Sequence, residues 1–121
     1  MSQAGTDDMF DAAALDTLLD MIGGDAAALS ELIESFLDEG PGLIDRIERA
    51  AAGGDAEALR QAAHTMKSSA ADFGATELSR LCREMETLGR AGRADGATTL
   101  SLQAAASWQA AAVALRGYMK G

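Results

Sequence analysis

Apolar residues recur every three or four positions along most of the chain, which is the spacing of amphipathic helices. The pattern predicts a short first helix over residues 9–22, ended by Gly23-Gly24. Asp25 is the expected N-cap of a second, longer helix over 25–52. We expect this second helix to bury one stripe, formed by Leu29, Leu32, Ile33, Phe36, Leu37, Leu43, Ile44, Ile47 and Ala51.

Gly40-Pro41-Gly42 interrupts the second helix. A proline inside a helix costs about 3 kcal/mol and usually kinks or ends it. The apolar phase nevertheless resumes after Pro41 on about the same face. We therefore expect one bent helix over 25–52, with two separate helices as the alternative.

Three further helices follow. The third runs from Asp55 to about Phe73, the fourth opens at Ala75 or Thr76, and the last spans 95–119. The basic, glycine-rich stretch 89–96 is expected to be a connector or a frayed helix end. The apolar positions that should be buried are, in order, Leu59, Ala62, Met66, Ala70 and Phe73; Leu78, Leu81, Cys82, Met85 and Leu88; and Leu100, Ala104, Trp108, Ala111, Leu115 and Tyr118.

The expected fold class is all-α, an antiparallel four-helix bundle with an additional short N-terminal helix. Composition supports this class, because alanine is abundant and the chain holds one proline and a single valine. We expect residues 1–8 to be a flexible N-terminus and 9–121 to be a single domain. The starting methionine and the lack of a linker indicate a stand-alone protein, with a domain of a larger sensor kinase as the alternative.

The net charge of −9 and the lack of a basic patch argue against nucleic-acid binding. No apolar run approaches the ~20 residues that a membrane span needs. Residues 1–8 carry no basic or apolar segment of a secretory signal, and a single cysteine fits a reducing cytoplasm. Phosphate-binding glycine motifs and groups of metal ligands are absent from the sequence, so we expect neither a cofactor nor a metal.

His64 is the only histidine, and its helical phase directs it outward. At about 100° per residue, Met66 and Phe73 of the buried stripe lie on the opposite side of the third helix. The residues that share the outward face with His64 are Arg60, Gln61, Lys67, Ser68 and Ala71.

This outward face suits phosphoryl transfer, which depends mainly on positioning and charge stabilisation. A neutral imidazole is a good nucleophile, and a phosphoryl group on it would lie close to Lys67 one turn away. Short side chains beyond Lys67 would let another protein approach closely, so we assign Arg60, Gln61, Ser68 and Ala71 to partner docking. Hydrolytic catalysis is disfavoured, because Ser68 and His64 lack a third orienting group and an oxyanion hole.

The segment 63–69, Ala-His-Thr-Met-Lys-Ser-Ser, carries a family resemblance. Together with the residues that follow it, it resembles the histidine-containing phosphotransfer (HPt) domain of bacterial phosphorelays. The downstream elements that agree are Phe73-Gly74-Ala75, Leu78, Leu81-Cys82 and Met85-Glu86, and the upstream ones are Phe36-Leu37 and Gly54-Asp55. The resemblance covers roughly residues 15–90, and Ser68 stands where the family often has glycine.

The resemblance implies that His64 is the phosphoacceptor, through its outer ring nitrogen, and that Lys67 supports the phosphoryl group. It implies a cytoplasmic phosphorelay intermediate with no kinase or hydrolase machinery, which exchanges phosphoryl groups with receiver domains of response regulators. The receiver supplies the aspartate and Mg²⁺, a hybrid sensor kinase is a further candidate partner, and a monomer is expected. The alternative is a helical adaptor that docks receiver domains or other partners without being phosphorylated.

Overall fold

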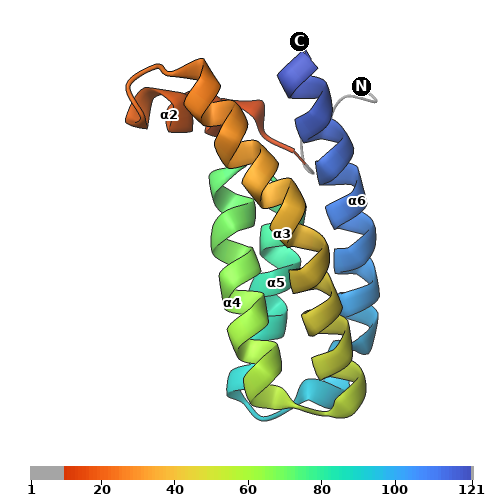
Figure 1. The fold of residues 1–121 in the computed structure, drawn as a ribbon. Helices are drawn as coiled ribbons and strands as arrows, with labels where there is room; N and C mark the ends of the chain where they lie inside the picture. The colour runs from red at the N-terminus through yellow and green to blue at the C-terminus, as the bar shows by residue number, and fades with distance from the viewer. Residues whose placement is uncertain (1–9, 121) are drawn as a thin grey trace, which may run out of the picture.

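The computed structural model describes residues 10–120, so the expectation of a flexible segment over 1–8 lies outside the described residues. Six elements follow in order: α2 (Ala12–Met21), α3 (Ala26–Gly53), α4 (Ala56–Asp72), α5 (Thr76–Arg90), the 3-10 turn η1 (Ala94–Ala97) and α6 (Thr98–Lys120). No strand occurs between residues 10 and 120. Figure 1 shows α3, α4, α5 and α6 as an antiparallel bundle, with α2 at one end. The predicted all-α bundle with a short N-terminal helix is confirmed.

Aspartates start three of the helices. The side chains of Asp11, Asp25 and Asp55 each accept a hydrogen bond at 3.0 Å from a backbone N–H in the first turn of α2, α3 and α4, respectively. A cap of this kind stabilises a helix by about 1 kcal/mol. Gly54 then ends α3 in the left-handed region, at φ 71°. The recurring glycine–aspartate pairs in the sequence therefore determine where one helix ends and the next begins.

Pro41 lies inside α3, which continues unbroken from Ala26 to Gly53, so the alternative of two separate helices is wrong. The neighbouring Gly40 is buried against the ring of Trp108 from α6. A Cβ at this glycine would lie 2.1 Å from that ring. Trp108 meets Phe36 edge-on at 5.0 Å, and Phe36 stacks on Phe73 at 4.7 Å. The Gly-Pro-Gly segment thus admits a tryptophan to the helix backbone, where it joins α3 to α6.

Two expectations from the sequence need correction, one about the burial of Leu32 and one about the stretch 89–96. Leu32 is exposed, because the buried line of α3 runs through Leu29, Ile33 and Phe36, and Leu32 lies about 100° to one side of Ile33. The stretch 89–96 is neither a continuous connector nor a frayed end, because Gly89 is buried in the last turn of α5 and Ala94–Ala97 forms η1. A Cβ at Gly89 would lie 2.8 Å from the carbonyl oxygen of Ala56 and from the backbone nitrogen of Arg60, so only glycine lets α5 approach α4 this closely.

The core is built mostly from leucine, isoleucine, methionine and alanine, as the composition suggests, together with Phe36, Phe73 and Trp108. Met66 and Met85 are fully buried fillers, and Cys82 is buried in α5 as expected. Burial, with a smaller contribution from Glu86, raises the pKa of the Cys82 thiol to about 12. This thiol is therefore a packing residue and remains protonated in the folded protein.

The arrangement of the four long helices determines which surfaces are open. The helix α4 packs against α3 and α5, and α6 packs against the same two helices from the other side. In Figure 1, α4 and α6 accordingly stand at opposite corners of the bundle. Across residues 10–120, the structure contains no helix with the length and apolar character needed to cross a membrane.

Candidate functional site

His64 lies on the outer side of α4, with its side chain 55 % exposed. Ala63 and Met66 are both fully buried, so the other side of this helix turn faces the core. The outward direction predicted from helical phase is confirmed.

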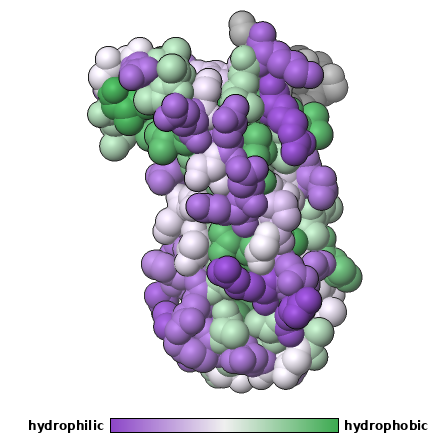
Figure 2. Space-filling model, in the orientation of Figure 1, coloured by the Kyte–Doolittle hydropathy of each residue, from purple (hydrophilic) through white to green (hydrophobic). Residues whose placement is uncertain are grey.

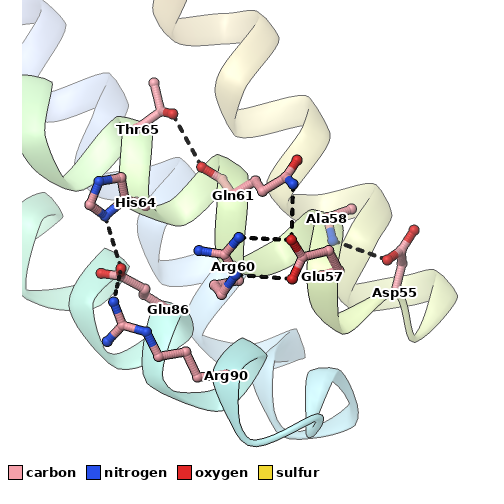
Figure 3. A network of polar contacts seen from close by, with 9 residues as sticks. All are labelled: Asp55, Glu57, Ala58, Arg60, Gln61, His64, Thr65, Glu86 and Arg90. Carbon is pink, nitrogen blue, oxygen red and sulfur yellow. Dashed lines mark hydrogen bonds and ion pairs between the residues drawn. The ribbon is translucent and has the colours of Figure 1, made fainter.

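A carboxylate from the neighbouring helix holds the imidazole. Oε2 of Glu86 in α5 lies 2.9 Å from Nδ1 of His64 (Figure 3). Because an ionised carboxylate can only accept hydrogen bonds, Nδ1 carries the proton and donates it to Glu86. In the neutral ring, Nε2 then keeps its lone pair. Glu86 thus selects the tautomer in which the nitrogen away from α5 is the nucleophilic one.

Two cations share this carboxylate with His64. Nζ of Lys67 lies 2.6 Å from Oε1 of Glu86, and a guanidinium nitrogen of Arg90 lies 2.9 Å from Oε2. The Glu86 side chain is only 2 % exposed. The ammonium of Lys67, with help from His64 and Arg90, holds the pKa of this carboxyl below its usual range, although burial acts in the opposite direction.

The charge balance of the cluster favours an incoming anion. A buried carboxylate is costly unless it is paired and hydrogen-bonded, and Glu86 meets that condition with three partners. Lys67 and Arg90 carry two positive charges against the single negative charge of Glu86. With a neutral His64, the cluster therefore has one excess positive charge, on cations that share the carboxylate of the imidazole.

Two contacts fix α5 against α4 on either side of Glu86. Toward the start of α5, the hydroxyl of Ser79 donates to the backbone carbonyl of Lys67 at 3.1 Å. Toward its end, Gly89 allows the close helix approach described above. Glu86 lies between these two points, so its carboxylate is held level with the turn that carries His64 and Lys67.

Arg60 and Gln61 are engaged with a different carboxylate. Arg60 donates twice to Glu57, at 3.0 and 2.7 Å, and Gln61 donates to the same residue at 2.9 Å (Figure 3). The guanidinium of Arg60, followed by the amide of Gln61, lowers the pKa of Glu57 to about 2. Both residues lie near His64 on α4, but their polar groups turn toward the start of the helix rather than toward the imidazole.

Ser68 and Ala71 continue the outward face beyond Lys67, and both are exposed. Ala71 also borders a shallow hollow of about 370 Å³ between α4 and α2, whose other lining residues are Ala14, Thr17, Leu18, Met21 and Asp72. Figure 2 shows apolar surface gathered over α2, at the upper left of the molecule. A second hollow, of about 600 Å³, lies along α3 and α4 and includes Arg46, Arg49, Gln61 and Thr65. The His64 face is therefore flanked by an apolar hollow on one side and a partly basic one on the other.

Sequence reasoning did not assign Glu86 or Arg90 to the site. The available signal was the position of Glu86, which lies one turn after Cys82 at the edge of the apolar stripe of α5. A charged residue at such a position needs partners, which are Arg90 one turn further on the same helix and Lys67 and His64 on the adjacent one. In the part of the chain that the structure describes, no group of three or more His, Cys, Asp and Glu residues could hold a metal ion.

A helical bundle that presents an outward histidine, backed by a buried carboxylate and two cations, fits the class of histidine phosphotransfer proteins. The model of the Hpt domain family matches residues 31–117 of this chain, so the chain belongs to the Hpt domain family. The match extends through most of α6, which the sequence resemblance did not cover. Hpt proteins are phosphotransfer intermediates that work with receiver domains and hybrid histidine kinases in phosphorelays, and this chain has a histidine phosphotransfer role.

Two solved structures share the fold. Histidine-containing phosphotransfer protein B (HptB) from Pseudomonas aeruginosa PAO1 is 23% identical with a TM-score of 0.82, covering 93% of this chain and 95% of its own. The HPT domain of an Hpt sensor hybrid histidine kinase from Shewanella is 17% identical with a TM-score of 0.73, covering 88% of this chain and 92% of its own. No curated protein sequence matches this chain significantly.

Proposed function

We propose that His64 is the phosphoacceptor, which takes a phosphoryl group from the aspartate of one receiver domain and passes it to the aspartate of another. The observation that carries this proposal is the contact between His64 Nδ1 and Glu86. That contact leaves Nε2 as the nucleophile on the exposed side of the ring. The alternative, an adaptor that is never phosphorylated, gives no reason for a buried carboxylate to hold an exposed imidazole.

In the transfer step, the lone pair of Nε2 attacks the phosphorus of the receiver's aspartyl phosphate. The N–P bond forms as the P–O bond to the aspartate breaks, and the aspartate leaves as a carboxylate. The proton on Nδ1 stays in place, so the ring acquires positive charge as the bond forms. Glu86 stabilises this charge through its hydrogen bond to Nδ1. The reverse reaction returns the phosphoryl group to a second receiver by the same route.

Lys67 supports the phosphoryl group electrostatically. Its ammonium lies on the same carboxylate as the imidazole and is one turn from His64. A phosphoryl group on Nε2 carries about two negative charges, which the excess positive charge of Lys67 and Arg90 offsets. We assign docking of the receiver to the surface around this site, with Ser68 and Ala71 as small residues at its centre and Arg60 and Gln61 at its edge.

The remaining chemistry belongs to the partners. The receiver domain supplies the aspartate and the Mg²⁺ that transfer requires, and this chain needs no cofactor and has no kinase or hydrolase activity of its own. A hybrid sensor kinase is a further partner, and the protein acts in the cytoplasm. One chain is a complete transfer unit, because α4 and α5 of the same chain supply the histidine, carboxylate and cations.

The direct test is to incubate the protein with receiver domains that carry labelled phosphate and to follow acid-labile label on the chain. Label should appear on the parent and be lost with His64→Gln, while binding to the receiver persists. A matched control is Gln109→His, which places a histidine on the exposed side of α6 in the His64→Gln background. Label on that control, or on His64→Gln itself, would contradict the assignment of His64. Receiver binding without label on any variant would favour the adaptor.

A further inference from the structure

The outer face of α6 differs from the other exposed helix surfaces. The segment 96–115 contains no charged residue, although about a quarter of the whole chain is charged. Within this face, Leu102 is 61 % exposed and Val113 is 67 % exposed. They lie eleven positions apart, which is close to three turns, so both lie on one line of the helix. The exposed residues on or beside that line between them are small or uncharged: Ala106, Gln109 and Ala110.

Between residues 96 and 115, the helix is therefore uncharged on its outer side as well as on its inner side. Its inner side is covered by α3 and α5 through Ala104, Trp108, Ala111 and Leu115. A surface helix normally has charged and polar residues on the side opposite its core stripe, and here that side has Leu102 and Val113 instead of charges. In the bundle, the outer side of α6 lies at the corner opposite α4 and has no covering element among residues 10–120 (Figure 1).

We propose that this outer face binds a second copy of the same chain, in an antiparallel pair of α6 helices related by a two-fold axis. In such a pair, each residue meets the one that lies equally far on the other side of the axis. The midpoint between Leu102 and Val113 falls between residues 107 and 108, so one axis position brings each exposed leucine against the exposed valine of the other copy. The small residues between them let the two backbones approach closely.

Charge supports the same register independently. Asp95 lies in η1, directly before α6, and the midpoint in the sequence between Asp95 and Lys120 also falls between residues 107 and 108. The axis that pairs Leu102 with Val113 therefore places the carboxylate end of one copy near the ammonium end of the other. Both residues are exposed, and neither forms an ion pair with another described residue. This coincidence of apolar and charged pairs favours a second copy over an unrelated partner.

The net charge of the chain also limits which surface can contact a second copy. Two chains of net charge −9 repel each other, and contact through any of the carboxylate-rich surfaces of α3 would bring like charges together. The segment 96–115 is where two copies can meet without that cost. Because α4 stands at the opposite corner from α6, pairing leaves both His64 sites open, so it does not interfere with transfer by each chain.

The interface is narrow, since it is one helix face wide. An interface well below the standard size of ~1,600 Å² gives weak association, so we expect dimers to form only at high concentration. Sedimentation equilibrium of the full chain should show the average mass rise from one chain toward two between about 10 µM and 1 mM. A single-chain mass throughout this range would overturn the proposal.

Paired variants locate the contact. Leu102→Asp with Val113→Asp should remove the rise in mass, while Met21→Asp should not, although Met21 of α2 is 77 % exposed. Circular dichroism establishes that each variant remains folded. If the α6 variant self-associates like the parent, or Met21→Asp abolishes association, the contact lies elsewhere and the proposal fails.

Cross-linking tests the orientation without relying on a destabilising change. Ala106 and Gln109 are equally far from the proposed axis. A mixture of Ala106→Cys and Gln109→Cys chains should therefore form disulfide-linked dimers faster than either variant alone. The native Cys82 is buried and does not compete. Equally fast cross-linking of each variant with itself would indicate a parallel pair and overturn the antiparallel one, and no cross-link in the mixture would overturn pairing through this face.

Discussion

Two exposed helix surfaces of this bundle differ in what lies directly beneath them. Under the surface formed by His64, Lys67 and Arg90 lies the buried carboxylate of Glu86. Under the outer face of α6 lie alanines, a tryptophan, a leucine and two serines, and no charged side chain. In the first surface, His64, Lys67 and Arg90 each contact the charged Glu86, and this contact orients their side chains. In the second surface no buried charge orients the side chains, so this surface suits the binding of a partner of complementary shape rather than a chemical reaction.

The difference shows how little of a surface's function depends on exposure itself. His64 and Val113 are similarly open to solvent, and both lie within long helices. What separates them is whether a side chain from the next helix reaches the same point. Adding or removing a single carboxylate at each surface therefore tests the comparison.

The largest effect is expected from removing the carboxylate under His64. Glu86→Gln keeps the size of the side chain but loses the charge that stabilises the imidazole during transfer. We expect the rate of phosphoryl transfer to His64 to fall on the order of 100-fold. The rate is measured as the appearance of acid-labile label from a phosphorylated receiver.

The control for this variant is Glu84→Gln. Glu84 lies on the same helix and pairs with Arg80 at the exposed surface, away from the histidine. It should transfer at nearly the parental rate. Equal rates for Glu86→Gln and the parent would show that the imidazole needs no carboxylate, and the contrast between the two surfaces would disappear.

A smaller effect is expected on acid stability. The folded protein lowers the pKa of Glu86 below the ordinary value of 4.5. The carboxylate therefore stabilises the fold above that pH, and this contribution is lost as pH falls through the folded pKa. Below about pH 4.5, the free energy of unfolding of the parent should fall more steeply than that of Glu86→Gln.

This stability difference is measured by urea denaturation at a series of pH values. Glu57 and Glu77 also have lowered pKa values, but they are present in both proteins and affect both curves alike. If the free energy of unfolding depends on pH in the same way for the parent and the variant, the three partners of Glu86 do not stabilise its charged form.

The smallest effect is expected from adding a carboxylate on α6. Ala110→Glu places a good helix former at an exposed position, so the free energy of unfolding should stay within about 0.5 kcal/mol of the parent. Transfer to His64 should be unchanged, and only self-association should be lost. A marked drop in either stability or transfer, measured by the same two assays, would show that this face has a role in the folded monomer.

The helices and the direction of His64 could be predicted because both depend on local spacing. Aspartate caps and apolar periodicity place each helix to within a few residues, and the 100° step per residue is enough to separate His64 from Met66. The continuity of α3 through Pro41 was also predictable, since the apolar phase is the same on both sides of the proline.

The partnership between His64 and Glu86 could not be predicted from these signals. It depends on the offset and rotation of α5 against α4, which are set by Ser79, Gly89 and the packing between them. Helical phase places a residue on its own helix but carries no information about the height of the neighbouring helix. For the same reason, the sequence pattern predicts a connector or a frayed helix end at Gly89, although the role of this glycine is to permit a close helix contact.

The buried Cys82 can report local opening of α5 without an added probe. It is the only cysteine in the chain, and it lies one turn before Glu86. Because its thiol reacts as the thiolate, a pKa of about 12 and full burial leave it almost unreactive toward alkylating reagents while α5 is docked. The rate of alkylation therefore reports how often α5 separates from the bundle. A lower rate in the phosphorylated protein than in the unphosphorylated one would show that the phosphoryl group stabilises the docked position of this helix.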